Sequence, residues 1–354
     1  MVTHTDTFIV GTGPYGLTLG NYLADAGADF VIAGRPMELW LNHTFSTASL
    51  RSNVPTSEIP SPDDRFAFAA FHRETGQSGP VPTGRVNNHI YREYVHWVLK
   101  GLQFDIIEQY VTSIERDGDR YRVAVQSGET FSARNVVLAC GVAHHLNVPP
   151  ELVDDPRVVH SYDVPKIENL RDERVLVIGA GQSAAEAIKS LEINGNTVHW
   201  FSRQQPKYFE EPLNLPTWIF NLVVQGAAVL RALPAPIVQR IFGIFSATTI
   251  TPNHQPQLER VLHCLRMPPL DDYDRIVAAT GFRYSINFLN FLSEDIQYAL
   301  ATKSGMPDVS RDFQSSLPGL YLLGPITEHA FGPPMKFMIG ARYAGPKLAG
   351  VLTS

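Results

Sequence analysis

The segment Thr7–Gly34 reads TFIVGTGPYGLTLGNYLADAGADFVIAG, and the rest of the architecture is predicted outward from it. An apolar run, a glycine-rich turn, an amphipathic stretch and a second apolar run predict strand, turn, helix and strand. Gly11, Gly13 and Gly16 form a G-x-G-x-x-G motif. The first glycine permits the tight turn, the second admits a pyrophosphate, and the third lets helix and strand pack closely. The unit predicts a dinucleotide site, with Pro14 and Tyr15 at the helix N-terminus that faces the phosphates.

The same pattern returns at Arg174–Arg203, which reads RVLVIGAGQSAAEAIKSLEINGNTVHWFSR. Its turn is the G-x-G-x-x-A variant, and the residues predicted to contact a nucleotide there are Gly179, Gly181, Gln182, Ser183 and Ala184. Because two complete units occur in one chain, we predict two bound dinucleotides. A degenerate repeat that binds nothing is the alternative interpretation of either unit.

The residue after the second strand of each unit indicates which nucleotide is bound, because an acid holds a ribose 2′-hydroxyl and an arginine suits a 2′-phosphate. In the second unit this position is Ser202, followed by Arg203. A guanidinium pairs bidentately with phosphate, so NADPH is predicted there, with an exposed surface arginine as the alternative. In the first unit the position is Gly34, followed by Arg35. The local rule alone would therefore predict a second NADP site.

Composition narrows the class of protein. With 354 residues, 44% hydrophobic and 18% charged, the chain is long enough for two or three globular domains. A net charge of −6 with no basic run argues against nucleic acid as a partner. Cys140 and Cys264 are far apart and in no metal-ligand spacing, so neither a bound metal nor a redox dithiol is predicted. The early first motif leaves no room for a signal peptide, and with few cysteines this favours the cytoplasm.

Residues 216–245 read PTWIFNLVVQGAAVLRALPAPIVQRIFGIF. The stretch is apolar but too often interrupted for a membrane span, which needs about 20 residues. It predicts two short helices joined at LPAP. A buried or homodimer-forming pair is the favoured interpretation, and a peripheral membrane contact or a surface that admits an oily substrate is the alternative.

Three further segments complete the pattern. RNVVLACGV at Arg134–Val142 and DRIVAATGF at Asp274–Phe282 are predicted strands that end near Gly141 and Gly281, where the chain would cross between domains. The run PGLYLLGPITEHAFGPPMKFMIGARYAGPKLAG at Pro318–Gly350 predicts a strand, a glycine turn, a loop and a helix. Together these features resemble the two-dinucleotide flavoproteins, in particular the flavin-containing and N-hydroxylating monooxygenases and the plant-type indole-3-pyruvate monooxygenases. The resemblance covers nearly the whole chain.

The resemblance implies an α/β fold of two Rossmann-like, three-layer domains. The FAD-binding domain, residues 1–165 and 275–354, would be split around an inserted NADPH-binding domain, residues 166–274. The first motif would then bind FAD, which reverses the local rule at Gly34 and makes Glu38 the candidate for the ribose contact. Arg35 would face the adenine or a phosphate. The other residues that the resemblance places at the flavin cofactor are Trp40, Gly324, Pro333, Met335 and Lys336.

The resemblance also implies an activity. Hydride would pass from NADPH to FAD, and the reduced flavin would react with dioxygen to give a C4a-hydroperoxide that oxygenates a heteroatom or a ketone of a small organic substrate. Asn53, in RSNVPTSEIPSPD, and His329, in TEHAFGPP, are the catalytic candidates. An Asx-turn residue and a structural loop histidine are the respective alternatives. The alternative functions are an FAD-dependent NADPH reductase without oxygen insertion and a nucleotide-binding regulator without turnover.

Overall fold

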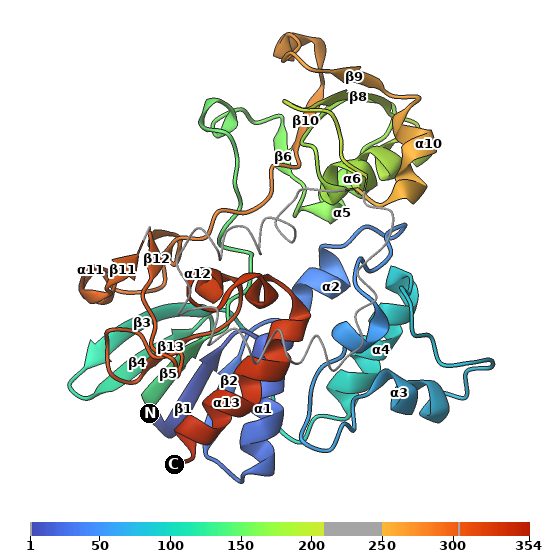
Figure 1. The fold of residues 1–354 in the computed structure, drawn as a ribbon. Coiled ribbons are helices and arrows are strands. Elements are labelled where there is room, and N and C mark those ends of the chain that lie inside the picture. The colour runs from blue at the N-terminus through green and yellow to red at the C-terminus, as the bar shows by residue number, and fades with distance from the viewer. Residues whose placement is uncertain (1, 209–249, 304) are drawn as a thin grey trace.

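Two large β-sheets with flanking helices and a small two-stranded sheet form the described part of the protein, as the computed structural model shows for residues 2–208, 250–303 and 305–354 (Figure 1). The predicted α/β class with two Rossmann-like units is confirmed by this arrangement. The apolar segment 216–245, for which helices were predicted, lies outside the described residues. Among the residues that are described, no helix has both the length and the apolar character to cross a bilayer.

The first sheet has the strand order β2-β1-β5-β4-β3, with β13 also paired to β5. The bounds are β1 Val2–Val10, β2 Phe30–Ala33, β3 Val111–Asp117, β4 Arg120–Val125, β5 Thr130–Leu138 and β13 Leu320–Leu322. β1 pairs in parallel with β2 and β5. On its other edge β5 pairs antiparallel with β4 over its first half and parallel with β13 over its second half. The C-terminal strand therefore returns to the N-terminal sheet.

Two long helices cover one face of this sheet. α1, Pro14–Asp25, follows the first glycine turn, and α13, Ala341–Leu352, packs alongside it (Figure 1). The approach is close, because a Cβ at Gly345 would lie only 2.5 Å from the Thr18 Cγ2 atom. The C-terminal segment thus completes the core around the first glycine motif.

The second sheet is entirely parallel, in the order β6-β10-β7-β8-β9. Its strands are β6 Val158–His160, β7 Arg174–Ile178, β8 Thr197–Phe201, β9 Leu262–Cys264 and β10 Arg275–Ala278. Around it lie α5 Val164–Glu168, α6 Gln182–Ile193 and α10 Gln255–Leu258. Because β6 and β10 pair with the rest, this sheet extends beyond the expected limits of 166 and 274 on both sides. Strands β7 and β10 are almost wholly buried, as is typical of a parallel sheet with both faces covered.

A third layer is helical and has its own core of aromatic and aliphatic side chains. It contains α2 Glu38–Asn42, α3 Phe68–Glu74 and α4 Asn88–Lys100. Asn87 caps α4, since its side-chain oxygen accepts a hydrogen bond from the Ile90 amide at 2.9 Å. The remaining elements are α11 Glu294–Ala299, α12 Glu328–Phe331, β11 Thr302–Lys303, β12 Met306–Pro307 and short 3₁₀ turns that include η1 Val54–Thr56, η7 Pro333–Lys336 and η8 Met338–Gly340.

Candidate functional site

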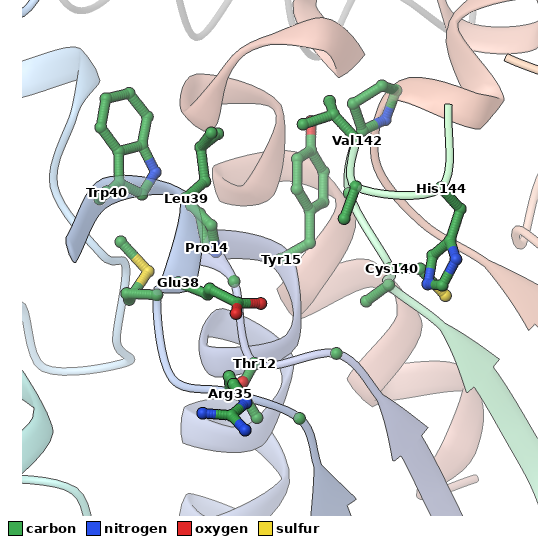
Figure 2. A pocket seen from close by; sticks show the side chains of 18 of the residues that line it. Thr12, Pro14, Tyr15, Arg35, Glu38, Leu39, Trp40, Cys140, Val142 and His144 are labelled. Carbon is green, nitrogen blue, oxygen red and sulfur yellow. The ribbon is translucent and has the colours of Figure 1, made fainter. Parts of the chain in front are cut away.

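A cavity of about 550 Å³ opens at the carboxyl ends of β1, β2 and β5. This edge of a parallel sheet is where nucleotides bind in doubly wound folds. Figure 2 shows that its labelled side chains come from the first glycine turn, the β2–α2 segment and the segment after β5. The C-terminal residues 336–338 form a further wall. The fold thus brings segments that lie far apart in the sequence to one cavity.

Many of the predicted cofactor residues line this cavity, namely Gly11, Gly13, Pro14, Tyr15, Arg35, Glu38, Trp40, Gly141 and Lys336. Gly324, Pro333 and Met335 lie in the same C-terminal region but are not among the lining residues. Met335 is fully buried, and Gly324, at φ +85°, packs against the Tyr15 ring.

The three glycines of the first motif are needed for different reasons. Gly11 has φ +108°, and a Cβ there would collide with the Ala139 carbonyl. A Cβ at Gly16 would collide with the Gly11 carbonyl. At Gly13, by contrast, φ is −78° and a Cβ would meet nothing within 4 Å. The protein itself therefore does not require glycine at position 13, whereas a bound pyrophosphate close to the backbone would.

The backbone geometry after β2 explains why Gly34 stands where an acidic residue is usual. Gly34 has φ +150°, and a Cβ there would lie 2.9 Å from the Thr12 hydroxyl oxygen, so a side chain is disfavoured at this position. Glu38 opens α2, and its carboxylate lines the cavity, where it accepts a hydrogen bond from the Tyr110 hydroxyl. Burial, and then this contact with Glu38, raises the pKa of Tyr110 to about 12, so the phenol remains a donor. The Arg35 guanidinium carbon lies 5.3 Å from the centroid of the Tyr110 ring.

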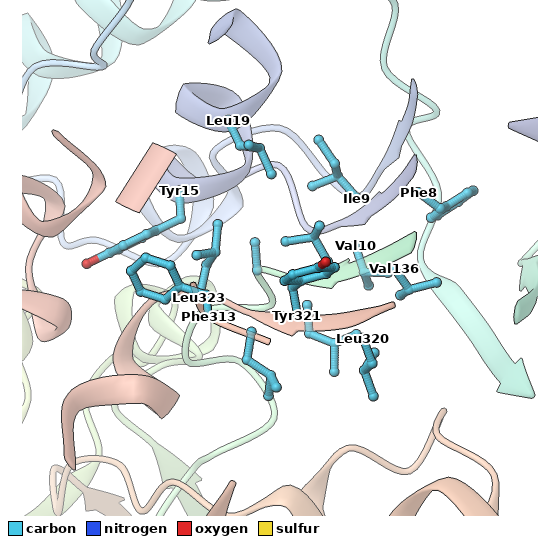
Figure 3. Packing of buried hydrophobic residues seen from close by; sticks show 14 of the residues in the cluster. Phe8, Ile9, Val10, Tyr15, Leu19, Val136, Phe313, Leu320, Tyr321 and Leu323 are labelled. Atoms are coloured by element: carbon cyan, nitrogen blue, oxygen red, sulfur yellow. The ribbon is translucent and has the colours of Figure 1, made fainter. Parts of the chain in front are cut away.

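Tyr15 ties the glycine turn to the C-terminal segment. Its hydroxyl donates to the Met335 carbonyl at 2.8 Å and lies 3.0 Å from the Phe337 carbonyl. Figure 3 shows the ring reaching from α1 into the cluster that contains Phe313 and Leu323. Burial raises the pKa of Tyr15 well above its ordinary value, so the hydroxyl keeps its proton.

Replacing Tyr15 by phenylalanine should lower the free energy of unfolding by about 1–3 kcal/mol, because buried carbonyls lose their donor. Urea unfolding of the purified protein measures the change. Tyr298→Phe is the matched control, since Tyr298 is 95% exposed and should leave stability unaltered. Equal free energies of unfolding for the Tyr15 variant and this control would contradict a stabilising role for the Tyr15 hydroxyl bond.

The second glycine turn has the same construction as the first. Gly179 has φ +149°, and a Cβ there would collide with the Ala279 carbonyl. Gly181 caps α6, Ser183 is exposed in the first helical turn, and Ala184 is fully buried. The Gln182 side chain accepts from the Thr251 amide at 2.9 Å and donates to Glu186 at 2.9 Å. Gln182 therefore joins α6 to the chain at residue 251, and its predicted contact with a nucleotide remains a prediction.

The two residues that follow β8 and are predicted to bind a 2′-phosphate differ in their exposure. Ser202 is 2% exposed, and its hydroxyl donates to the Gln204 carbonyl at 2.6 Å and lies 2.7 Å from the His263 Nε2 atom. Arg203 is exposed. The placement favours Arg203, and not Ser202, as the residue that meets a phosphate. Gly281, at the second crossing, has its carbonyl engaged by the His160 ring at 3.0 Å.

The two catalytic candidates are placed apart from the lining of the cavity. Asn53 precedes η1, and its neighbours Arg51 and Ser52 line the cavity while Asn53 itself does not. Its side chain makes no capping hydrogen bond to η1, and the catalytic role of Asn53 remains a prediction. His329 lies in α12 and is likewise not a lining residue. Lys336 lines the cavity and pairs with Glu328 at 2.7 Å.

The two cysteines do not form a redox pair. Both are free, Cys140 after β5 and Cys264 in β9 of the other sheet. Burial raises the pKa of the Cys140 thiol to about 12, so the reactive thiolate is not populated near neutral pH. Dithiol chemistry is therefore disfavoured in this chain.

Several lining residues were not predicted from the sequence, among them Thr12, Arg51, Ser52, Tyr110, Tyr162, Phe282, Tyr284, Phe291, Phe337 and Met338. Arg51 and Ser52 adjoin Asn53 in the quoted stretch RSNVPTSEIPSPD, so their position beside this candidate was the available signal. Tyr110 and Phe291 belong to no motif, and only the folded sheet brings them to the cavity.

Two sheets that each carry a glycine turn at the carboxyl end define the class of two-dinucleotide oxidoreductases. The chain belongs to the pyridine nucleotide-disulphide oxidoreductase family, whose family model matches residues 8–324. The resemblance to two-dinucleotide flavoproteins is thereby confirmed.

Three known proteins illustrate the similarity. An ornithine N-hydroxylase from Kutzneria sp. 744, in a structure with reduced FAD, NADP⁺ and L-ornithine, has a TM-score of 0.81 at 20% identity over 99% of both chains, which shows a shared fold. A senecionine N-oxygenase from Tyria jacobaeae is 22% identical over 315 residues, 81% of this chain and 60% of that protein. A ferredoxin–NADP reductase from Thermus thermophilus is 26% identical over 187 residues, 52% of this chain and 48% of that protein. The chain thus spans about half to three fifths of the length of these two curated relatives.

Proposed function

We propose that this protein is an FAD-dependent, NADPH-using monooxygenase that oxygenates a heteroatom or a ketone of a small organic substrate. One observation carries the proposal: a single cavity joins the first glycine turn to the C-terminal wall, while a second glycine turn, followed by Arg203, stands in the neighbouring parallel sheet. This arrangement suits one enclosed cofactor and one exchangeable nucleotide.

The residues of the cavity fit FAD. The space above Gly13 and the N-terminus of α1 would take the pyrophosphate, and Glu38 would accept hydrogen bonds from the ribose hydroxyls. When bound, the flavin accepts hydride from NADPH and passes electrons on to dioxygen. The apolar rings around the cavity, such as Trp40, would exclude water from this exchange.

The second turn would hold NADPH. Backbone amides after Gly181 and the exposed Ser183 are available to the pyrophosphate, and Arg203 would pair with the 2′-phosphate. Asn53 would donate from its amide to the nicotinamide carboxamide or to the reacting oxygen. Its support is position: it follows two lining residues, and its backbone carbonyl is fixed by the Thr56 hydroxyl at 2.8 Å.

The comparisons support oxygen insertion over simple reduction in two ways. The ornithine N-hydroxylase shares the fold over the full length, and the senecionine N-oxygenase matches over most of the chain. The free, separated cysteines also leave no dithiol through which electrons would pass. From its low cysteine content we further propose that the enzyme is cytoplasmic.

Glu38→Gln should raise the Kd for FAD about 10-fold, because a neutral amide accepts weaker hydrogen bonds from the ribose than a carboxylate does. Titration of the apoprotein with FAD, followed by flavin fluorescence, measures the effect. Glu115→Gln is the matched control, because Glu115 is exposed on β3 and does not line the cavity. An unaltered Kd for the Glu38 variant would remove this residue from the ribose site.

The function is tested by incubating the FAD-loaded protein with NADPH, isotopically labelled dioxygen and separate panels of amines, sulfides, ketones and aromatic acids. Product that carries labelled oxygen, with NADPH consumed in equal amount, is the expected result. NADPH consumption without labelled product in every panel would contradict oxygen insertion.

A reductase is the second candidate, favoured by the match to the ferredoxin–NADP reductase. It predicts rapid NADPH-dependent reduction of added ferredoxin and no labelled product. The same protein preparation can be assayed for both activities.

A further inference from the structure

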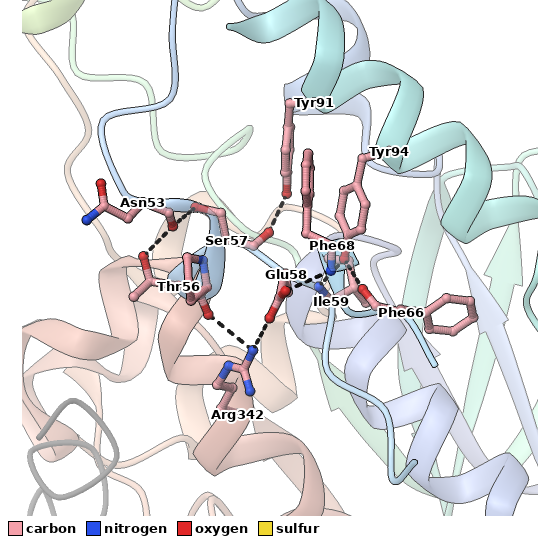
Figure 4. Close-up of polar contacts among 11 residues, drawn as sticks. Asn53, Thr56, Ser57, Glu58, Ile59, Phe66, Phe68, Tyr91, Tyr94 and Arg342 are labelled. Carbon is pink, nitrogen blue, oxygen red and sulfur yellow. Dashed lines mark hydrogen bonds and ion pairs between the residues drawn. The ribbon is translucent and has the colours of Figure 1, made fainter. Parts of the chain in front are cut away.

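The segment that follows Asn53 is held by a buried network of polar contacts, shown in Figure 4. The Arg342 guanidinium, at the start of α13, donates to the Glu58 carboxylate at 2.5 Å and to the Pro55 carbonyl at 3.1 Å. The second Glu58 oxygen accepts from the Phe68 amide at 2.7 Å. Both side chains are mostly shielded, with 23% of Arg342 and 14% of Glu58 exposed, so the contact is not a loose surface pair.

A second contact joins the same two parts of the chain. The Tyr91 hydroxyl, from α4, donates to the Ser57 carbonyl at 2.9 Å and lies 3.0 Å from the Met338 sulfur. Met338 lines the cavity. Tyr91 is 1% exposed, and burial raises its pKa well above the ordinary value, so its hydroxyl stays protonated.

The network lies between two walls of the cavity. One wall contains Arg51 and Ser52, a few residues before Glu58, and the other contains residues 336–338, a few residues before Arg342. The Ser57 hydroxyl contacts the Ser52 hydroxyl at 3.1 Å, which links the network directly to the first wall. The ion pair therefore fixes the distance between an N-terminal wall and a C-terminal wall that lie far apart in the sequence.

We propose that Glu58 and Arg342 are positioning residues that set the two walls of the cavity around the cofactor and hold Asn53 beside it. The inference rests on the proposed function, because it assigns the cavity to FAD. Neither side chain lines the cavity, so each acts through the residues that do. A misplacement of about 1 Å in an active site can cost about 100-fold in rate, so a fixed spacing between the walls has a chemical consequence.

The test uses Glu58→Gln, which keeps the shape and the acceptor for the Phe68 amide but removes the charge, and Arg342→Met, which removes the donor. Lys347→Gln is the matched control, because Lys347 lies on the same helix and pairs with Asp312 at 3.1 Å away from the cavity. Arg342→Lys tests rescue by a conservative change. Visible circular dichroism of the FAD-loaded proteins reports the surroundings of the flavin, and the melting temperature reports global stability.

We expect both disruptive variants to bind FAD but to alter its visible dichroism. We also expect them to divert about 10-fold more NADPH to hydrogen peroxide, with flavin reduction by NADPH altered by less than about two-fold. Lys347→Gln should match the wild type, and Arg342→Lys should lie between. Wild-type dichroism and wild-type peroxide release in Glu58→Gln would overturn the inference. If one disruptive variant fails to retain FAD, the dichroism and peroxide release of the other decide, and wild-type values there would also overturn the inference. Loss of FAD from both disruptive variants would overturn it as well. A wild-type protein that binds no flavin would instead overturn the proposed function.

Discussion

Gly13→Val should abolish tight FAD binding while the protein stays folded. We expect the Kd for FAD to rise by about 100-fold or more, which corresponds to about 2.7 kcal/mol. The reason is geometric, since φ at Gly13 is −78° and no protein atom lies within 4 Å of an added Cβ. The valine would therefore occupy only the space that the pyrophosphate needs.

Isothermal titration with FAD and the melting temperature of the apoprotein measure the two parts of this prediction. Gly84→Val is the matched control, because an added Cβ there also meets nothing and the position is exposed and away from the cavity lining. Gly16→Val is the contrast, since its Cβ collides with the Gly11 carbonyl and should unfold the protein. Undiminished FAD affinity in folded Gly13→Val would refute the first nucleotide site.

Arg203→Ala should lower kcat/KM for NADPH by about 10- to 100-fold and leave kcat/KM for NADH unaltered. A hydrogen-bonded pair between guanidinium and phosphate contributes about 1.5–3 kcal/mol, and NADH lacks the 2′-phosphate. Initial rates of flavin reduction with each nucleotide give both constants.

The matched control is Arg260→Ala, which removes another exposed arginine, just after α10. If both nucleotides lose activity equally in Arg203→Ala, the residue supports the fold of the turn and does not select NADPH. If neither loses activity, the 2′-phosphate is bound elsewhere.

Local patterns of the sequence predicted the local structures well. Both glycine turns, with their strands and helices, follow from residue type and spacing alone, and both have the predicted construction. The return of the C-terminal strand to the first sheet followed from resemblance, because the pairing of β13 with β5 joins residues that are far apart in the chain. The sheet to which β6 and β10 belong was harder to predict, since a short parallel strand carries no signal for the sheet it joins.

In the candidate site, too, the sequence predicted positions better than it predicted side-chain contacts. Glu38 was found because the acid expected at Gly34 was missing, and the structure supplies the reason in the close approach of Thr12. Tyr110 holds Glu38 from 72 residues away, and no motif marks it. Ser202 follows the nucleotide rule by position, yet its hydroxyl is turned to Gln204 and His263 inside the fold. Side-chain direction depends on packing partners, which spacing alone does not reveal.

The positions of the cysteines argue against a redox dithiol. A disulphide requires two cysteines that lie close together, whereas Cys140 follows a strand of one sheet, Cys264 lies in the other sheet, and both are free. Cys140 lines the cavity, but its raised pKa would make it a small apolar neighbour of the proposed cofactor. The chain therefore has both glycine turns without a dithiol, and the proposed function assigns dioxygen or an external acceptor as the group that takes the electrons.

The most direct test of the central claim, that one chain binds FAD in the cavity and NADPH at the second turn, is anaerobic mixing of the FAD-loaded protein with NADPH. We predict loss of the visible flavin absorbance, faster with NADPH than with NADH, because hydride passes between the two bound nucleotides. Flavin absorbance that persists with excess NADPH in the absence of oxygen would contradict the claim and indicate a protein that binds nucleotides without turnover.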